Sequence, residues 1–150
     1  MNPAIGRIVC ATLLTMMLST ASAADLPPIE GTWLSGDGDG WIEVTLDGDG
    51  LSGVIKGSPN ENDDRPDRDE KNPDPSLRER PLTGLELFAG FSYDGDGRWE
   101  GGTIYDPNSG KTYRCIITWV DRNTLKVRGY IGVPMLGRTE TWKRVADRSP

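Results

Sequence analysis

Three copies of the tetrapeptide Asp-Gly-Asp-Gly, at residues 37–40, 47–50 and 94–97, are the first candidates for chemistry in this sequence. Clustered carboxylates suit calcium, but an EF-hand loop needs a third acid or amide at its fifth position. The fifth position here is Trp41, Leu51 or Arg98. Asp-Gly pairs also tolerate the positive φ angles of tight hairpin turns. We therefore expect three hairpin turns and no metal, with calcium as the less favoured alternative.

The chain contains no histidine, which removes Ser-His-Asp and Cys-His nucleophile systems, histidine general bases and most zinc sites. Cys115 alternates with apolar residues, so we expect a buried, unreactive thiol. Lys111 lies near Tyr105 and Asp106 around a turn. A lysine base beside a tyrosine is conceivable there, but an ordinary hairpin is the favoured interpretation. We expect no catalytic residues and no cofactor.

The elements that must position these residues are strands, because apolar residues mostly alternate along the chain. Short connections join antiparallel neighbours, and a closed barrel removes exposed sheet edges. The sequence therefore predicts an all-β fold, an eight-stranded antiparallel up-and-down barrel, with a two-sheet β-sandwich as the alternative. The expected strands are residues 31–35, 40–46, 51–57, 82–93, 98–105, 112–120, 124–131 and 138–145.

Aromatic and basic residues give this barrel two expected features. Trp33 in the first strand would stack on Arg144 or Arg138 of the last, a cation–π contact of about 0.5–2 kcal/mol that closes one end. An eight-stranded barrel can also hold one small ligand. The residues that we expect to line or close its interior are Trp33, Tyr105, Tyr113, Trp119, Tyr130, Arg138 and Trp142.

One segment, residues 58–80, differs from the rest because it is polar, rich in proline and dense in both signs of charge. A loop of this length is usually functional or disordered, and we expect it to cover or flank one barrel end. Its acids are expected to form a solvated charge run: Glu61, Asp63, Asp64, Asp67, Asp69 and Glu70. Arg78 and Arg80 would pair with Asp69, Asp74 or Asp106 as a structural clamp.

The N-terminus has the features of a signal peptide. Arg7 precedes an apolar run at residues 8–18, and residues 21–23 have the small-x-small form of a cleavage site. We expect cleavage near Ala23, one domain over residues 24–150, and a periplasmic or secreted protein. The run is too short to span a membrane. A net charge of −6 argues against nucleic acid as a partner and against a polybasic membrane-surface role.

Several short motifs in order resemble the bacterial family of small secreted proteins labelled domain of unknown function 2147. They are Gly31-x-Trp33, Asn72-Pro73-Asp74, Leu77-Arg78-x-Arg80-x-Leu82-x-Gly84, Gly102-x-Ile104-Tyr105-Asp106-Pro107, Gly110-Lys111-x-Tyr113, Leu125-x-Val127-Arg128-Gly129-Tyr130 and Gly137-Arg138-Thr139-x-x-Trp142. The resemblance implies export and a small calyx-like barrel similar to those of lipocalins and fatty-acid-binding proteins. It brings no established catalytic residues. The chain departs from a simple calyx at its charged loop, where Asn72, Asp74, Arg78 and Arg80 lie outside the expected strands and would serve as lid, rim or structural clamp.

Together these features favour a non-enzymatic barrel that binds a small apolar or amphipathic ligand in the cell envelope. The alternative is a structural module that binds an envelope protein and whose interior is filled by side chains. An enzyme working through carboxylates and Lys111 is the least favoured reading. Neither stable membrane insertion nor nucleic-acid binding is expected.

Overall fold

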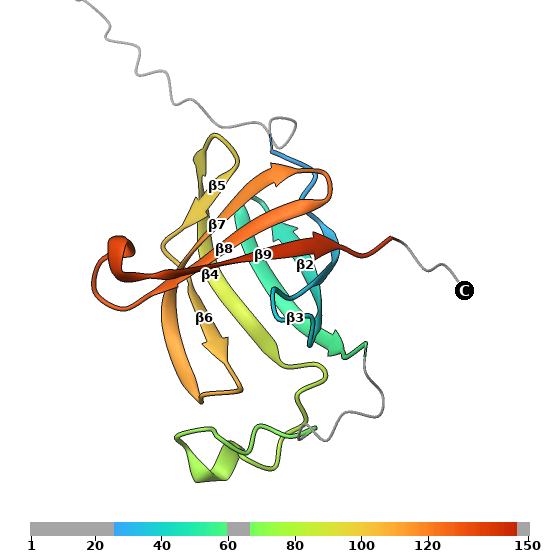
Figure 1. Ribbon diagram of the computed structural model, residues 1–150, viewed down its shortest axis with the longest axis vertical. Coiled ribbons are helices and arrows are strands. Elements are labelled where there is room, and N and C mark those ends of the chain that lie inside the picture. Colours follow the sequence, from blue (N-terminus) through green and yellow to red (C-terminus); the bar gives the residue numbers. More distant parts are fainter. Residues whose placement is uncertain (1–25, 60–66, 147–150) are drawn as a thin grey trace, which may run out of the picture.

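The computed structural model describes residues 26–59 and 67–146, which form an all-β barrel (Figure 1). Strands that are neighbours around the barrel pair antiparallel, and the last strand pairs with the first, so the sheet closes on itself. This closure excludes the sandwich and confirms the up-and-down barrel. The strands are β1 (Gly31–Leu34), β2 (Trp41–Asp47), β3 (Gly50–Gly57), β4 (Glu86–Gly95), β5 (Arg98–Glu100), β6 (Thr103–Asp106), β7 (Lys111–Asp121), β8 (Thr124–Tyr130) and β9 (Arg138–Arg144).

Nine strand segments make eight barrel positions because β5 and β6 share one position. Both pair with β4 and with β7, at successive points along them. The strand expected over residues 98–105 is interrupted at Gly101 and Gly102. Gly101 has a φ of 85°, and a Cβ on Gly102 would lie 2.3 Å from the ring of Phe91. The interruption therefore lets the backbone pass close to a core aromatic ring.

All three Asp-Gly-Asp-Gly repeats lie at hairpin turns, as predicted. They connect β1 to β2, β2 to β3 and β4 to β5. In the second turn Gly48 has a φ of 63°, and in the third Asp96 and Gly97 have φ values of 51° and 72°. Aspartate and glycine supply the left-handed conformations that these tight connections need.

The strand expected from residue 82 begins later, at Glu86. Gly84 has a φ of 90°, in the left-handed region that favours glycine, and its N–H donates to the carbonyl of Ile55. Residues 82–85 therefore turn the chain from the charged loop into the barrel wall. Two short 3-10 helices lie between strands: η2 (Pro75–Leu77) between β3 and β4, and η3 (Pro134–Leu136) between β8 and β9. No helix in the described ranges 26–59 and 67–146 is long and apolar enough to cross a membrane.

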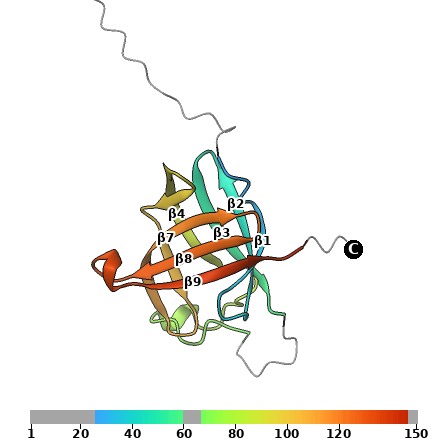
Figure 2. The same cartoon turned by 45° about the horizontal axis from the view of Figure 1, so that its top comes forward.

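Side chains fill one half of the barrel interior. Trp33, Trp99 and Ile117 are fully buried there, and Phe91 packs edge-on against Phe88. The predicted closure is present at this end: the Arg144 guanidinium lies 4.2 Å from the Trp33 ring centre and also donates to the carbonyls of Pro28 and Glu30. These bonds fix the segment before β1 to β9, and Figure 2 shows β1 beside β9.

Candidate ligand-binding site

The other half of the interior is a cavity of about 610 Å³. Its floor is apolar and consists of inward residues from several strands: Ile42, Ile55, Leu87, Ile104, Val127 and Trp142. Its mouth is polar, because two turns and the charged loop meet there. Among residues 26–59 and 67–146, the mouth carries six acidic and three basic residues: Asp37, Asp39, Asp67, Glu70, Asp106 and Glu140, with Arg68, Lys71 and Arg138. An apolar body with a few placed polar groups is the usual form of a small-molecule site.

The structure places four of the seven expected interior residues on this cavity: Tyr105, Tyr113, Arg138 and Trp142. The other three lie elsewhere. Trp33 is fully buried in the filled half, and Trp119 packs edge-on against it with ring centres 6.3 Å apart. Tyr130 faces a surface groove beside Arg114. The expected set thus divides between the cavity, the filled end and the barrel exterior.

The sequence reasoning missed the aliphatic floor and Glu140. The sequence pattern did indicate these inward positions, because residues two apart on a strand, such as Val127 and Gly129, lie on the same face. Glu140 lies two residues from Trp142 on β9, and its carboxylate accepts a hydrogen bond of 3.2 Å from the Trp142 indole. It is the acidic residue that β9 contributes to the cavity wall. The polar mouth and the apolar floor therefore meet at these two side chains.

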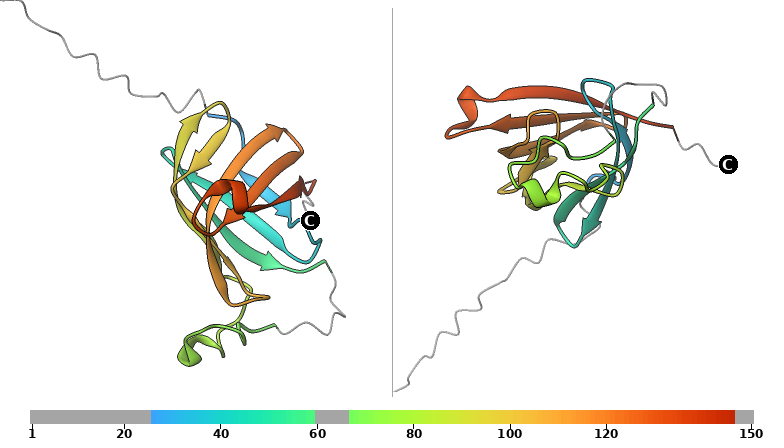
Figure 3. Two further views of the ribbon diagram at one scale, coloured as in Figure 1. Left: turned by 60° about the vertical axis from the view of Figure 1, so that its left-hand side comes forward. Right: turned by 90° about the horizontal axis from the view of Figure 1, so that it is seen from below.

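The charged loop lies across the cavity end of the barrel, as expected. Residues 67–82, which we call the lid loop, return on themselves: the Leu82 N–H donates to the Asp67 carbonyl and the Asp69 N–H to that of Arg80. Figure 3 shows the loop crossing below the barrel mouth. The acids Glu61, Asp63 and Asp64 lie outside the described residues. The lid loop is a closed loop with ends held together by hydrogen bonds and an ordered internal structure.

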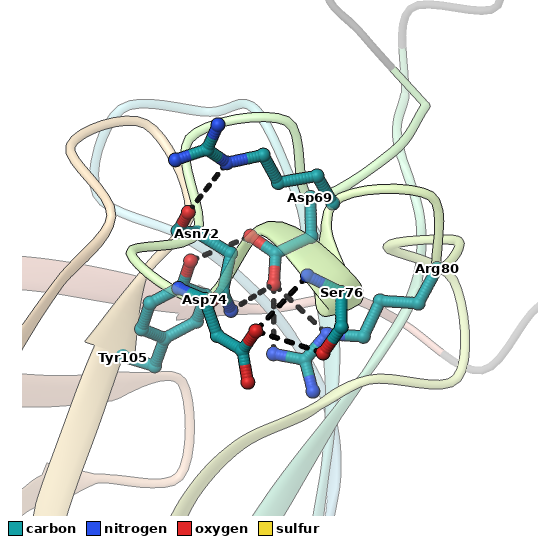
Figure 4. A network of polar contacts seen from close by, with 7 residues as sticks. Asp69, Asn72, Asp74, Ser76, Arg80 and Tyr105 are labelled. Atoms are coloured by element: carbon teal, nitrogen blue, oxygen red, sulfur yellow. Dashed lines mark hydrogen bonds and ion pairs between the residues drawn. The ribbon is translucent and has the colours of Figure 1, made fainter.

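Asp69 is the centre of the lid loop, and it is fully buried. Its Oδ1 accepts a 2.5 Å hydrogen bond from the Tyr105 hydroxyl on β6. Its Oδ2 accepts 2.7 Å bonds from the Asn72 amide and from Arg80 Nη2 (Figure 4). The expected pairing of Arg80 with Asp69 is therefore confirmed. The expectation that Asp69 belongs to a solvated charge run is wrong, because three donors replace its water.

These contacts set the protonation states of Asp69 and Tyr105. Burial alone would raise the pKa of Asp69, but the hydrogen bonds from Tyr105, Asn72 and Arg80 outweigh it and hold that pKa below its usual value. Burial, together with the Asp69 carboxylate, raises the pKa of Tyr105 to about 12. At neutral pH the carboxylate is thus ionised and the phenol protonated. This arrangement keeps the hydrogen bond between the lid loop and the barrel wall.

The remaining polar residues of the expected clamp shape the lid loop itself. The Asp74 carboxylate accepts from the backbone N–H of Ser76 at 2.9 Å and so begins η2. These Ser76 contacts lower the pKa of Asp74. Arg78, which we expected to pair with an acid, donates its Nε–H to the Asn72 carbonyl at 2.8 Å. Arg78 therefore clamps backbone, while Arg80 clamps the buried carboxylate.

A second contact joins the lid loop to the turn between β6 and β7. The Lys71 ammonium donates to the Asn108 carbonyl at 2.7 Å. A Cβ on Gly110 would lie 1.9 Å from the Lys71 carbonyl, and Gly110 has a φ of 70°. Only glycine fits this approach. The Asn108 amide also donates to Asp39 at 3.1 Å, so the first Asp-Gly-Asp-Gly turn belongs to the same mouth.

The residues considered for catalysis have structural contacts. Asp106 accepts from the Asn108 N–H and the Ser109 hydroxyl of its own turn. Lys111 is exposed and does not line the cavity that Tyr105 and Asp106 reach. Cys115 is fully buried, as predicted, and burial together with Glu140 raises its pKa to about 12. Within residues 26–59 and 67–146, no three His, Cys, Asp or Glu side chains form a group that could hold a metal ion.

Comparisons with known proteins agree with this architecture. The family model described as an uncharacterised protein conserved in bacteria (DUF2147) matches residues 31–144. Among solved structures, the chain is similar to protein HP1028 from the human pathogen Helicobacter pylori, which is described as belonging to the lipocalin family. The TM-score is 0.70 at 22% identity, over 79% of this chain and 83% of that chain. A search of curated proteins found no match. The shared feature is the lipocalin-like barrel.

Proposed function

The chain belongs to the DUF2147 family of bacterial proteins, and we propose that it is an exported binding protein that holds one small, partly apolar ligand under its lid loop. The observation that carries this proposal is the cavity of about 610 Å³ with an apolar floor and a polar mouth. Known small-molecule sites occupy roughly 300–1,000 Å³. The ligand's apolar body would lie against Trp142 and Val127, with its polar end at the charged mouth.

The cavity also weighs against the alternative of an envelope module whose interior is filled. Side chains fill only the half around Trp33 and Trp99, and the half under the lid loop stays open. A barrel with a purely structural role gains nothing from such a space, since unfilled volume costs stability. A binding role explains why small residues such as Gly129 face the interior at this end.

We propose binding without catalysis for a chemical reason. A tyrosine with a pKa of about 12 is a poor base at neutral pH, and the Tyr105 hydroxyl already donates to Asp69. Asp106 is occupied within its own turn. Lys111 lies outside the cavity lining, so it does not form a base–acid pair with Tyr105 or Asp106 in the space where a ligand would lie.

Export is part of the proposal and rests on the sequence of residues 1–23, which lie outside the described residues. The expected mature chain begins after Ala23 and has one domain. Mass determination of protein recovered from the periplasm or medium checks this directly. A mass that still includes residues 1–23 would contradict it.

Native mass spectrometry of protein purified from its own host tests the binding role. We expect the folded chain to carry an added mass of one small molecule that collisional activation or organic extraction removes. The same protein expressed in a foreign host provides the control. A protein that emerges free of added mass from its host, and that takes up no compound from an extract of host lipids, would contradict the proposal.

A further inference from the structure

The hairpin between β8 and β9 extends beyond the barrel wall, at the left of Figure 1, and its tip is apolar. Four large apolar side chains of residues 131–136 are exposed: Ile131 at 67%, Val133 at 52%, Met135 at 89% and Leu136 at 80%. Within residues 26–59 and 67–146, these four side chains are not buried against any other part of the protein. Clustered exposed apolar residues of this kind mark an interaction surface.

The tip has a defined shape. Residues 134–136 form η3, and Arg128 on β8 donates to the carbonyl of Pro134 at 2.8 Å and to the Thr139 hydroxyl at 2.7 Å. A Cβ on Gly137 would lie 2.6 Å from the Gly129 carbonyl, so the two arms of the hairpin meet closely. The apolar side chains are therefore presented outward by a braced turn.

Charge distinguishes this hairpin from the rest of the protein. The whole chain has a net charge of −6, yet residues 124–139 contain no acid and three bases: Lys126, Arg128 and Arg138. Tyr130 lies at the base of the tip, beside the Arg114 guanidinium. Exposed apolar residues flanked by bases and a tyrosine are typical of a segment that enters a bilayer interface.

We propose that residues 131–136 form a membrane-docking tip that inserts Met135 and Leu136 into the surface of an anionic bilayer. Arg138 and Lys126 would then lie at the level of the lipid headgroups, where bases near an anionic surface are stabilised. The tip is a narrow, convex hairpin, whereas a stable protein interface needs about 800 Å² from each partner, so a bilayer fits it better than a second protein. The contact is peripheral and involves no spanning segment.

Docking would also bring the cavity toward the membrane. Arg138 and Gly129 pair with each other at the start of the hairpin, and both line the cavity. An apolar ligand could therefore pass between bilayer and cavity with a short path through water. The docking proposal does not depend on this consequence, since it rests on the tip alone.

Vesicle co-sedimentation of the mature protein tests the proposal. We expect binding to vesicles of phosphatidylcholine and phosphatidylglycerol at low salt, and weaker binding to phosphatidylcholine alone. The double variant Met135→Ser/Leu136→Ser should lose binding by at least about tenfold, because each exposed apolar side chain contributes through its buried area. Lys126→Glu should weaken binding several-fold and reduce its dependence on salt.

Val120→Ser is the matched control, since Val120 is 48% exposed at the β7–β8 turn, away from the tip. It should bind as the unaltered protein does. Circular dichroism confirms that each variant keeps its strands. Absence of vesicle binding by the unaltered protein, or equal binding by the double variant, would overturn the proposal. Self-association in solution that the double variant abolishes, without vesicle binding, would overturn it in favour of an interface between copies.

Discussion

Replacement of Asp69 by asparagine should release the lid loop from the barrel without unfolding the barrel. The carboxylate accepts from Tyr105, Asn72 and Arg80, and it is fully buried. Asparagine keeps the shape but removes the charge. Hydrogen bonds to a charged group contribute about 1.5–3 kcal/mol and neutral ones about 0.5–1.5 kcal/mol. The asparagine NH2 group also cannot accept where the second carboxylate oxygen did, so the loss over the three partners is about 3 kcal/mol, or about two decades in an equilibrium constant.

Hydrogen exchange measured by mass spectrometry resolves this effect by region. We expect amides of the lid loop, including those of Asp69 and Leu82, to lose up to about 100-fold in protection. Amides of β7 and β8 should exchange as before, because their ladder does not involve the loop. Asp74→Asn is the matched control: it is an exposed carboxylate in the same loop, and we expect less than about tenfold change.

Two results would refute the reasoning. If Asp69→Asn leaves lid-loop protection within about threefold of the original, the buried carboxylate does not hold the loop. If β7 and β8 lose protection as much as the loop does, loop and barrel unfold as one unit and there is no separate lid. A double-mutant cycle with Tyr105→Phe then separates the contact between loop and wall from the contacts within the loop.

Other predictions follow from the same structure. Because the pKa of Asp69 is lowered, its contribution to lid-loop stability should be present above about pH 4 and lost as the pH falls through that lowered value, as exchange-based protection against pH will report. Because the pKa of Tyr105 is raised, its contribution should be complete below pH 10.0 and lost as the pH rises toward about 12, which a spectrophotometric tyrosine titration checks. Arg144→Met should lower the free energy of unfolding by about 3 kcal/mol in a urea titration, since it removes the cation–π contact and the hydrogen bonds to the N-terminal segment; a change below about 0.5 kcal/mol would contradict this. Gly110→Ala should cost more than about 1 kcal/mol, because it combines a positive φ with a clash at the lid loop, and an unchanged urea midpoint would show otherwise. Cys115 should react with a thiol reagent at least about 100-fold more slowly in the folded protein than in denaturant, and rapid labelling of folded protein would mean that the barrel opens there.

Features that depend on local sequence were predictable. The Asp-Gly-Asp-Gly repeats identify turns because the backbone conformation they permit is a property of those residues alone. The Trp33–Arg144 contact was also predictable, since barrel closure makes the first and last strands neighbours. The choice of Arg144 over Arg138 was not, because it depends on the register of β9 against β1.

Features that depend on distant partners were not predictable. Asp69 looks solvated among its charged neighbours, and its burial becomes favourable only when Tyr105, 36 residues away, supplies a donor. The size of the cavity is likewise a difference between the side-chain volume available and the space that the barrel encloses. No local sequence pattern predicts the volume of the cavity. The alternation of Val127 and Gly129 did predict that both share one face of their strand, and both line the cavity.

Titration of the ligand-free, refolded protein with the apolar fluorophore N-phenyl-1-naphthylamine tests the central claim most directly. Trp142 in the cavity floor can donate excitation energy to the bound probe. Gly129→Leu adds a side chain that would contact Tyr113 and Ile104 inside the cavity, whereas Thr141→Leu places a leucine at an exposed position on β9. We predict saturable binding of one probe per chain for the original and for Thr141→Leu, and at least tenfold weaker binding for folded Gly129→Leu. Equal binding by all three proteins, or no saturable binding at all, would contradict the account.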